Sequence, residues 1–272
     1  MGPMQRWSWD KCRYGEELLS KIAGRGVQVL VTRTIDMDHI DLDAAARLGI
    51  AVSNARYAPD SVLVALRRCK AAVCQQNVND YSLGGLEGRT LSSLAVGVVG
   101  TSAIGAAVMQ RLSGFGCKIL ATGHHVNTEV AKRAANVSQD ELFRASDVIS
   151  FHVPATPANH HLASRESLAG MKDGAVLVNA ARPDLMDVPA PAEGIGSGKI
   201  GAHAMDVFEG EQGICHINRT GDILRNRDMA CLRQFPDTVL AQRMAFCMAK
   251  AIEEMAETAV AKAHELFAGR NA

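Results

Sequence analysis

The feature that most constrains the fold is a buried strand, a glycine turn and a helix within residues 95–115. Residues 95–100 form an aliphatic strand pattern, and residues 104–115 place Ala, Val and Leu at helical spacing. The turn between them runs Gly-Thr-Ser-Ala-Ile-Gly, from Gly100 to Gly105. A strand, a glycine turn and a helix in this order open a βαβ unit, so they predict a parallel sheet.

The rest of the chain continues this alternation and predicts an α/β fold with a Rossmann-type, doubly wound parallel sheet. Residues 188–197 contain two prolines and two glycines, so an ordinary helix there would be weak. Other strands are expected at 27–32, 50–54, 117–122, 148–153, 175–179, 200–207 and 239–241, and helices at 41–48, 61–79 and 244–267.

The glycine turn is close to the pattern that binds a dinucleotide. That pattern has three glycines, of which Gly100 and Gly105 are present and the middle one is Ser102. The helix start at Ala103 and Ile104 still offers backbone amides to a pyrophosphate. The acidic residue expected about 20 positions later, which holds the ribose, is replaced by Gly123, followed by His124. We therefore expect NAD or NADP as the cofactor, with weakened discrimination between them.

Composition excludes several classes of protein. The chain has 29 basic and 29 acidic residues, which argues against a nucleic-acid or membrane-surface partner. Its seven cysteines are dispersed without a C-x-x-C pair, so we expect neither a disulfide framework nor a metal site. No signal-peptide pattern opens the sequence, and no apolar run approaches the roughly 20 residues of a membrane span. These features predict a soluble, cytoplasmic protein.

Beyond the glycine turn, several segments resemble, in order, the D-2-hydroxyacid dehydrogenase family, and most closely its D-lactate dehydrogenase and vancomycin-resistance 2-ketoacid reductase branch. The segments are 32–48, 57–62, 96–115, 146–157, 171–187, 198–211 and 235–246. The resemblance implies a truncated flavodoxin-like substrate domain over 1–62 and a dinucleotide-binding domain over 63–243. It also implies a C-terminal helix, 244–272, that packs back on the substrate domain, and it is compatible with a homodimer.

The resemblance also assigns the site residues. Arg182 falls on the family's substrate arginine, which binds a small carboxylate bidentately. Glu211 falls on the acidic partner of the catalytic histidine. Asp206 falls on the aspartate that faces the nicotinamide. The resemblance extends the cofactor site to Val153, Pro154, Ala180 and Ala181, and the substrate loop to Ile35 and Asp36.

The chain departs from the family where the chemistry takes place. Arg243 occupies the position of the general-acid histidine, and an arginine does not exchange a proton near neutrality. Asp36 adds a carboxylate where the family has glycine, which repels a carboxylate ligand, and Pro183 replaces the glycine after Arg182. His203, on the strand that leads to Asp206, and His152, at a strand end, are expected to be packed or cofactor-adjacent rather than catalytic. His160, His161 and His216 are expected in surface loops.

Two functions remain open from the sequence. Arg182, Asp206 and Glu211 favour an oxidoreductase that interconverts 2-keto and 2-hydroxy acids with NAD(P). Ser102, Gly123, Asp36 and Arg243, together with a late start relative to the family, favour a pseudoenzyme or a repurposed protein that binds a small anion or catalyses another step. We expect a family member that is impaired in the conventional reaction.

Overall fold

The computed structural model describes residues 14–25, 29–31, 40–48, 51–53, 61–123 and 128–244, together with 247 and 257. The chain divides into two compact units, Met1–Tyr57 with Phe246–Ala272, and Ala58–Ala245. Nearly all of the helix expected at 244–267 lies outside the described residues, as do Ile35, Asp36 and His124. None of the helices in the described part of the chain has the length and hydropathy of a membrane span.

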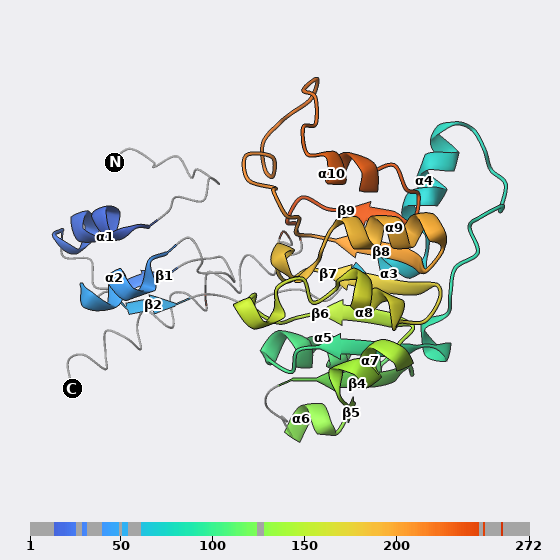
Figure 1. Ribbon diagram of the computed structural model, residues 1–272, viewed down its shortest axis with the longest axis horizontal. Helices are drawn as coiled ribbons and strands as arrows, with labels where there is room; N and C mark the ends of the chain where they lie inside the picture. Colours follow the sequence, from blue (N-terminus) through green and yellow to red (C-terminus); the bar gives the residue numbers. More distant parts are fainter. Residues whose placement is uncertain are drawn as a thin grey trace. The chain divides into compact units, whose positions relative to one another are not determined.

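The larger unit is built on a seven-stranded sheet in the order β5-β4-β3-β6-β7-β8-β9 (Figure 1). Every neighbouring pair in this sheet is parallel. The chain builds outward from β3 on one side and then returns to place β6 on the other, which creates a switch point between β3 and β6. The predicted doubly wound Rossmann sheet is confirmed. Its strands are β3 Ala95–Val99, β4 Lys118–Thr122, β5 Ala135–Asn136, β6 Val148–Phe151, β7 Ala175–Asn179, β8 Ile200–Met205 and β9 Thr238–Leu240.

Helices cover both faces of this sheet, because successive strand residues point to opposite faces and both faces are apolar. On β7, for example, Leu177 packs into one core cluster and Val176 into the other. One face carries α3 Ser61–Leu66, α5 Ala103–Ser113 and α6 Thr128–Ala131, whereas the other carries α7 Gln139–Ala145, α8 Arg165–Ala169, α9 Pro189–Ser197 and α10 Arg227–Leu232. Three short 3₁₀ turns complete the unit: η1 Leu91–Ser93, η2 Pro157–Asn159 and η3 Pro183–Leu185.

The helix predicted over 61–79 is in fact two helices. α3 ends at Leu66, and α4 runs over Cys69–Asn77. Between them Arg68 adopts a left-handed backbone with φ +49°, and its guanidinium lies 2.6 Å from Asp237 Oδ1. The break between α3 and α4 therefore coincides with an ion pair between Arg68 and Asp237, the residue before β9. The helical pattern of the sequence does not reveal this break.

The weak helix expected at 188–197 forms as α9. Pro189 is its first residue and Pro191 lies in its first turn, where a helix needs no backbone donors. Gly194 serves the packing, because a Cβ there would lie 2.7 Å from Ile200 Cγ1 on β8. Contact with the sheet thus outweighs the low helix propensity of these residues.

The smaller unit contains β1 Val29–Val31 paired in parallel with β2 Ala51–Ser53, and two helices, α1 Glu16–Ala23 and α2 Leu42–Arg47. Asp41 caps α2, because its Oδ1 accepts a 2.8 Å hydrogen bond from Ala44 N. The expected strands at 27–32 and 50–54, and the acid-capped helix at 41–48, are confirmed in slightly shorter form.

His203 on β8 is fully buried, and its Nε2 lies 3.1 Å from Met186 Sδ. Burial lowers its pKa to about 3. As the pH falls below about 6.5, the unfolded chain takes up a proton that the folded chain excludes, so the free energy of unfolding falls by up to about 1.4 kcal/mol per pH unit. Buried His152, with its pKa lowered to about 4, acts in the same direction.

We predict that His203→Leu reduces the loss of stability between pH 6.5 and 5, as measured by urea unfolding at both pH values. His216→Asn, a change at an exposed histidine, should leave the loss unchanged. An identical pH slope in wild type and His203→Leu would contradict the assignment.

Candidate active site

The turn between β3 and α5 requires glycine at both ends. Gly100 has φ +114°, and a Cβ there would lie 2.4 Å from the carbonyl oxygen of His152. A Cβ on Gly105 would lie 1.9 Å from Gly100 O. Ser102, in contrast, has φ −65° and caps α5 without a side-chain capping bond. Serine therefore fits the place of the middle glycine without backbone strain.

The start of α5 is suited to an anion. Ser102 and Ala103 are exposed, Ile104 is half-buried, and the first turn of α5 contains no acidic residue. The first amides of a helix have no partner within it and form its positive end. This cradle therefore fits the diphosphate of a dinucleotide.

The ribose position differs from this pattern. Gly123 directly follows β4, and a Cβ there would lie 2.3 Å from Thr101 Oγ1. The buried Thr101 side chain thus fills the space into which a residue at 123 would extend. No carboxylate is available at this position to hold a ribose.

His152 follows β6, on the far side of the switch point from β4. Its Nε2 lies 2.8 Å from Ser150 Oγ, and its burial lowers its pKa to about 4. The imidazole is therefore neutral at pH 7. Val153 and Pro154 follow it, half-buried and exposed respectively.

At the end of β7, Asn179 shapes the loop that carries Arg182. Its Oδ1 accepts a hydrogen bond of 3.1 Å from Ala181 N, and its Nδ2 donates one of 2.8 Å to Arg182 O. The Arg182 guanidinium donates to Ala181 O at 2.9 Å and is half-buried, as are Ala180 and Ala181. Pro183 begins η3 directly afterward, so the loop turns immediately beyond the arginine.

Three of the residues named from sequence meet beyond β8 and β9. Arg243 forms an ion pair with Glu211, and their side chains are only 16% and 7% exposed. Asp206 Oδ1 accepts a 2.8 Å hydrogen bond from Met244 N, and Asp206 O accepts one of 3.0 Å from Arg243 N. Glu211 Oε2 also accepts from Phe208 N at 2.9 Å. The arginine thus takes the place of the expected histidine as the partner of the glutamate.

Cys215 also belongs to this cluster, although no sequence pattern distinguishes it from the other cysteines. Its Sγ lies 3.7 Å from Glu211 Oε2. Burial, together with the charge of Glu211, raises its pKa to about 11. The residue is therefore a protonated thiol at pH 7.

Breaking the Arg243–Glu211 pair on one side strands a buried charge, which typically costs about 3–5 kcal/mol. We predict that Arg243→Met lowers the free energy of unfolding by about this amount, and that adding Glu211→Gln restores part of the loss. Urea unfolding of the single and double variants measures both effects. Arg219→Met, at an ion pair whose side chains are 53% and 55% exposed, should cost under about 1 kcal/mol. Equal costs for Arg243→Met and Arg219→Met would contradict the prediction.

Comparison with known proteins agrees with this geometry. Residues 60–240 match the sequence model of the NAD-binding domain of D-isomer specific 2-hydroxyacid dehydrogenases. An aromatic 2-oxoacid reductase of Clostridium sporogenes is 38% identical over 258 residues, which are 91% of this chain and 77% of that protein. A D-lactate dehydrogenase of Lactobacillus delbrueckii subsp. bulgaricus is 35% identical, covering 97% of this chain and 82% of that protein.

A solved structure of D-lactate dehydrogenase from Aquifex aeolicus, complexed with NAD and lactic acid, superposes with a TM-score of 0.79 at 30% identity. The match covers 94% of this chain and 80% of that one. With the fold, the order of motifs and these matches in agreement, the chain belongs to the D-2-hydroxyacid dehydrogenase family and contains its NAD-binding domain.

Proposed function

We propose that this protein binds NAD(P) and a small 2-keto or 2-hydroxy acid, and that it is impaired in the family's oxidoreductase reaction. The Arg243–Glu211 ion pair carries the proposal, because it fills the position of the general acid with a group that keeps its proton. When bound, a nicotinamide would supply or accept the hydride in this chemistry. The other roles follow from the residues around it.

The cofactor would be held along the switch point of the sheet. Gly100, Gly105 and the exposed amides at the start of α5 suit the diphosphate. The residues proposed for the nicotinamide end are Val153, Pro154, Ala180, Ala181 and Asp206, which follow β6, β7 and β8. Because ligands of such folds bind beyond the carboxyl ends of the strands, these positions are suitable.

Arg182 would bind the carboxylate of the acid and polarise its keto oxygen, since a guanidinium offers two parallel donors and a fixed charge.

Neither buried histidine of the sheet would replace the missing general acid. His152 is neutral at pH 7, with its pKa lowered to about 4, and His203 is packed against Met186 in the core. General acid catalysis is typically worth about 10²–10⁴-fold, so we expect that share to be absent.

A non-redox role for the same pocket is the second candidate. The ion pair between Arg243 and Glu211 favours this role. An arginine at this position can attract an anion without transferring a proton. A protein repurposed to bind a small carboxylate would need Arg182 and a positively charged neighbour, but no general acid.

One experiment separates these functions. Purified protein is titrated with NADH and NADPH by fluorescence, and then supplied with pyruvate or an aromatic 2-oxo acid. We expect both cofactors to bind, with little preference because Gly123 offers no carboxylate, and turnover to be slow. Fast turnover would contradict the proposed impairment, and absence of cofactor binding at millimolar concentration would contradict the oxidoreductase assignment.

We predict that Arg243→His raises kcat for 2-oxo acid reduction by at least about tenfold, because it supplies a proton donor next to Glu211. Arg219→His, at an exposed arginine, is the matched control and should leave kcat unchanged. An unchanged rate in Arg243→His would mean that the proton comes from elsewhere.

We also propose a homodimer. Several large apolar side chains on α3, on α4 and in the segment that follows are exposed, and a second copy of the chain would cover them. They are Leu63, Val64, Val73, Val78, Tyr81 and Leu83. Leu83 is 84% exposed, so Leu83→Asp should leave the folded chain intact and halve the mass measured by light scattering. Ile223 lies in a different segment and is 89% exposed, so Ile223→Asp should not change the mass. A monomeric wild type would contradict the proposal.

A further inference from the structure

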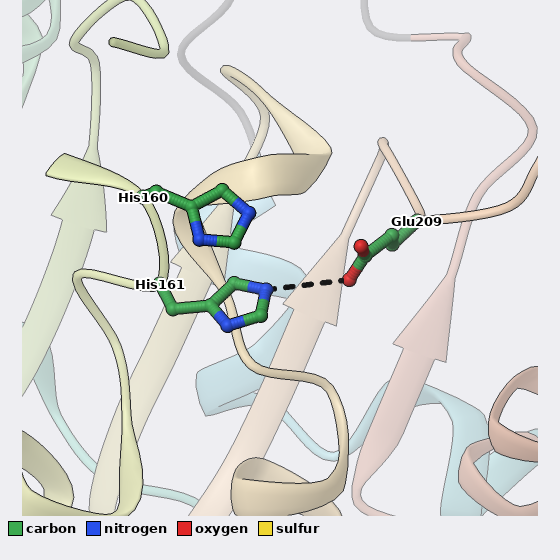
Figure 2. A group of neighbouring side chains, drawn as sticks. All are labelled: His160, His161 and Glu209. Carbon is green, nitrogen blue, oxygen red and sulfur yellow. Dashed lines mark ion pairs between the residues drawn. The ribbon is translucent and has the colours of Figure 1, made fainter. Parts of the chain in front are cut away.

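Two histidines and a glutamate meet near the carboxyl ends of the strands, apart from the residues of the candidate active site. His160 and His161 directly follow η2, and Glu209 lies beyond the end of β8 (Figure 2). His161 Nε2 lies 3.6 Å from Glu209 Oε2, and the two imidazole rings stack with centroids 3.8 Å apart. One potential ligand atom from each residue lies within 4.8 Å of the other two.

The histidine side of this cluster is held by the backbone. Asn159 Oδ1 accepts from Thr156 N at 2.7 Å, and its Nδ2 donates to Pro154 O at 2.8 Å, so the 3₁₀ turn before the histidines is tied at both ends. His161 N donates to Asp184 O at 2.8 Å. His161 also has a left-handed backbone with φ +52°, and both rings extend toward the side on which Glu209 lies (Figure 2).

The glutamate side is held in a similar way. Gly210 has φ +76° directly after Glu209, and the Asn226 side chain donates a 3.1 Å hydrogen bond to Glu209 O. The Glu209 side chain itself is 48% exposed. The Glu209 backbone is therefore held in place, while its exposed side chain can rotate toward a ligand.

The nitrogen of His161 that faces Glu209 provides an independent indication of a ligand. Although the side chain is 33% exposed, its Nε2 is enclosed and makes no hydrogen bond with any described residue. Enclosed polar atoms are nearly always partnered in proteins. A cation between this nitrogen and the Glu209 carboxylate would satisfy both groups.

We propose that His160, His161 and Glu209 bind a divalent transition-metal ion, with Zn²⁺ as the preferred ion among those available in cells. Two imidazoles and one carboxylate are ligands that suit zinc, with a fourth position left for water. Zinc–ligand distances are about 2.0–2.2 Å, so the three atoms would draw together slightly. His160 is exposed and can rotate out of the stacked arrangement to direct its nitrogen at the ion.

This site is separate from the proposed redox chemistry, because it uses neither the cofactor cradle nor Arg182. It nevertheless joins two segments of the candidate active site. Asp184, which anchors His161, lies two residues after Arg182, and Glu209 lies two residues before Glu211. A bound ion would therefore link the loop after β6, which is hydrogen-bonded to the loop after β7 through Asp184, to the loop after β8, and would stabilise these loops.

The test is a calorimetric titration of the full, chelator-treated chain with Zn²⁺. We expect one equivalent to bind, and His161→Asn and Glu209→Gln each to weaken that binding at least tenfold. His216→Asn is the matched control, because His216 is exposed and also left-handed, with φ +62°, so the same change is made without loss of a ligand. Asparagine tolerates this backbone conformation, and circular dichroism checks that each variant is folded.

A titration with Co²⁺ then identifies the ligands. Nitrogen and oxygen ligands give visible bands alone, whereas thiolate ligands add strong charge-transfer absorption in the near ultraviolet. Visible bands that are lost in both variants support the site. Thiolate bands, equal affinity in all variants, or no zinc binding would each overturn the proposal. None of these outcomes depends on NAD(P) binding or turnover, so failure of the metal site and failure of the proposed function are distinguishable.

Discussion

The larger unit depends on a close backbone approach at the switch point of its sheet. Gly100 allows the turn after β3 to pass beside the carbonyl oxygen of His152, and Gly105 allows the first turn of α5 to lie directly over Gly100. Any side chain at either place would push α5 away from the sheet. This contact leaves the exposed positive end of α5 between β4 and β6, which is why the cofactor cradle lies there.

The proposed chemistry of the site depends on Arg243, which is connected to neighbouring residues by an ion pair and by hydrogen bonds. Arg243 forms an ion pair with the buried Glu211, Glu211 in turn accepts from Phe208 N, and Asp206 accepts from the backbone of Arg243 and Met244. An arginine can hold this carboxylate, because the N–H groups of a guanidinium suit a carboxylate. It cannot donate a proton near neutral pH, so residue 243 can hold the glutamate without acting as a general acid. Under the proposed assignment, the family fold persists with an arginine at the position of the general acid.

The candidate metal cluster and the ion-paired site lie on loops of the same sheet edge, which reflects how such folds carry function. Parallel strands bring all their carboxyl ends to one edge, so loops distant in sequence meet there. His161 and Glu209 are an example, since they come from the loops after β6 and β8. Regular hydrogen bonding within the sheet holds both loops at fixed separation.

The amino-acid sequence by itself determined the α/β class, most of the strands, the glycine turn and the family, because these follow from local periodicity and from motifs in fixed order. It also named Arg182, Asp206, Glu211 and Arg243 as candidate site residues, of which the last three lie together in the structure. Only the tertiary structure decided features that depend on contacts between distant segments. The break at Arg68 accompanies a pairing with Asp237, and α9 forms because Gly194 packs against Ile200. Cys215 joins Glu211, and His161 meets Glu209, through folding alone. No local pattern encodes such meetings, since each depends on where the sheet places two loops.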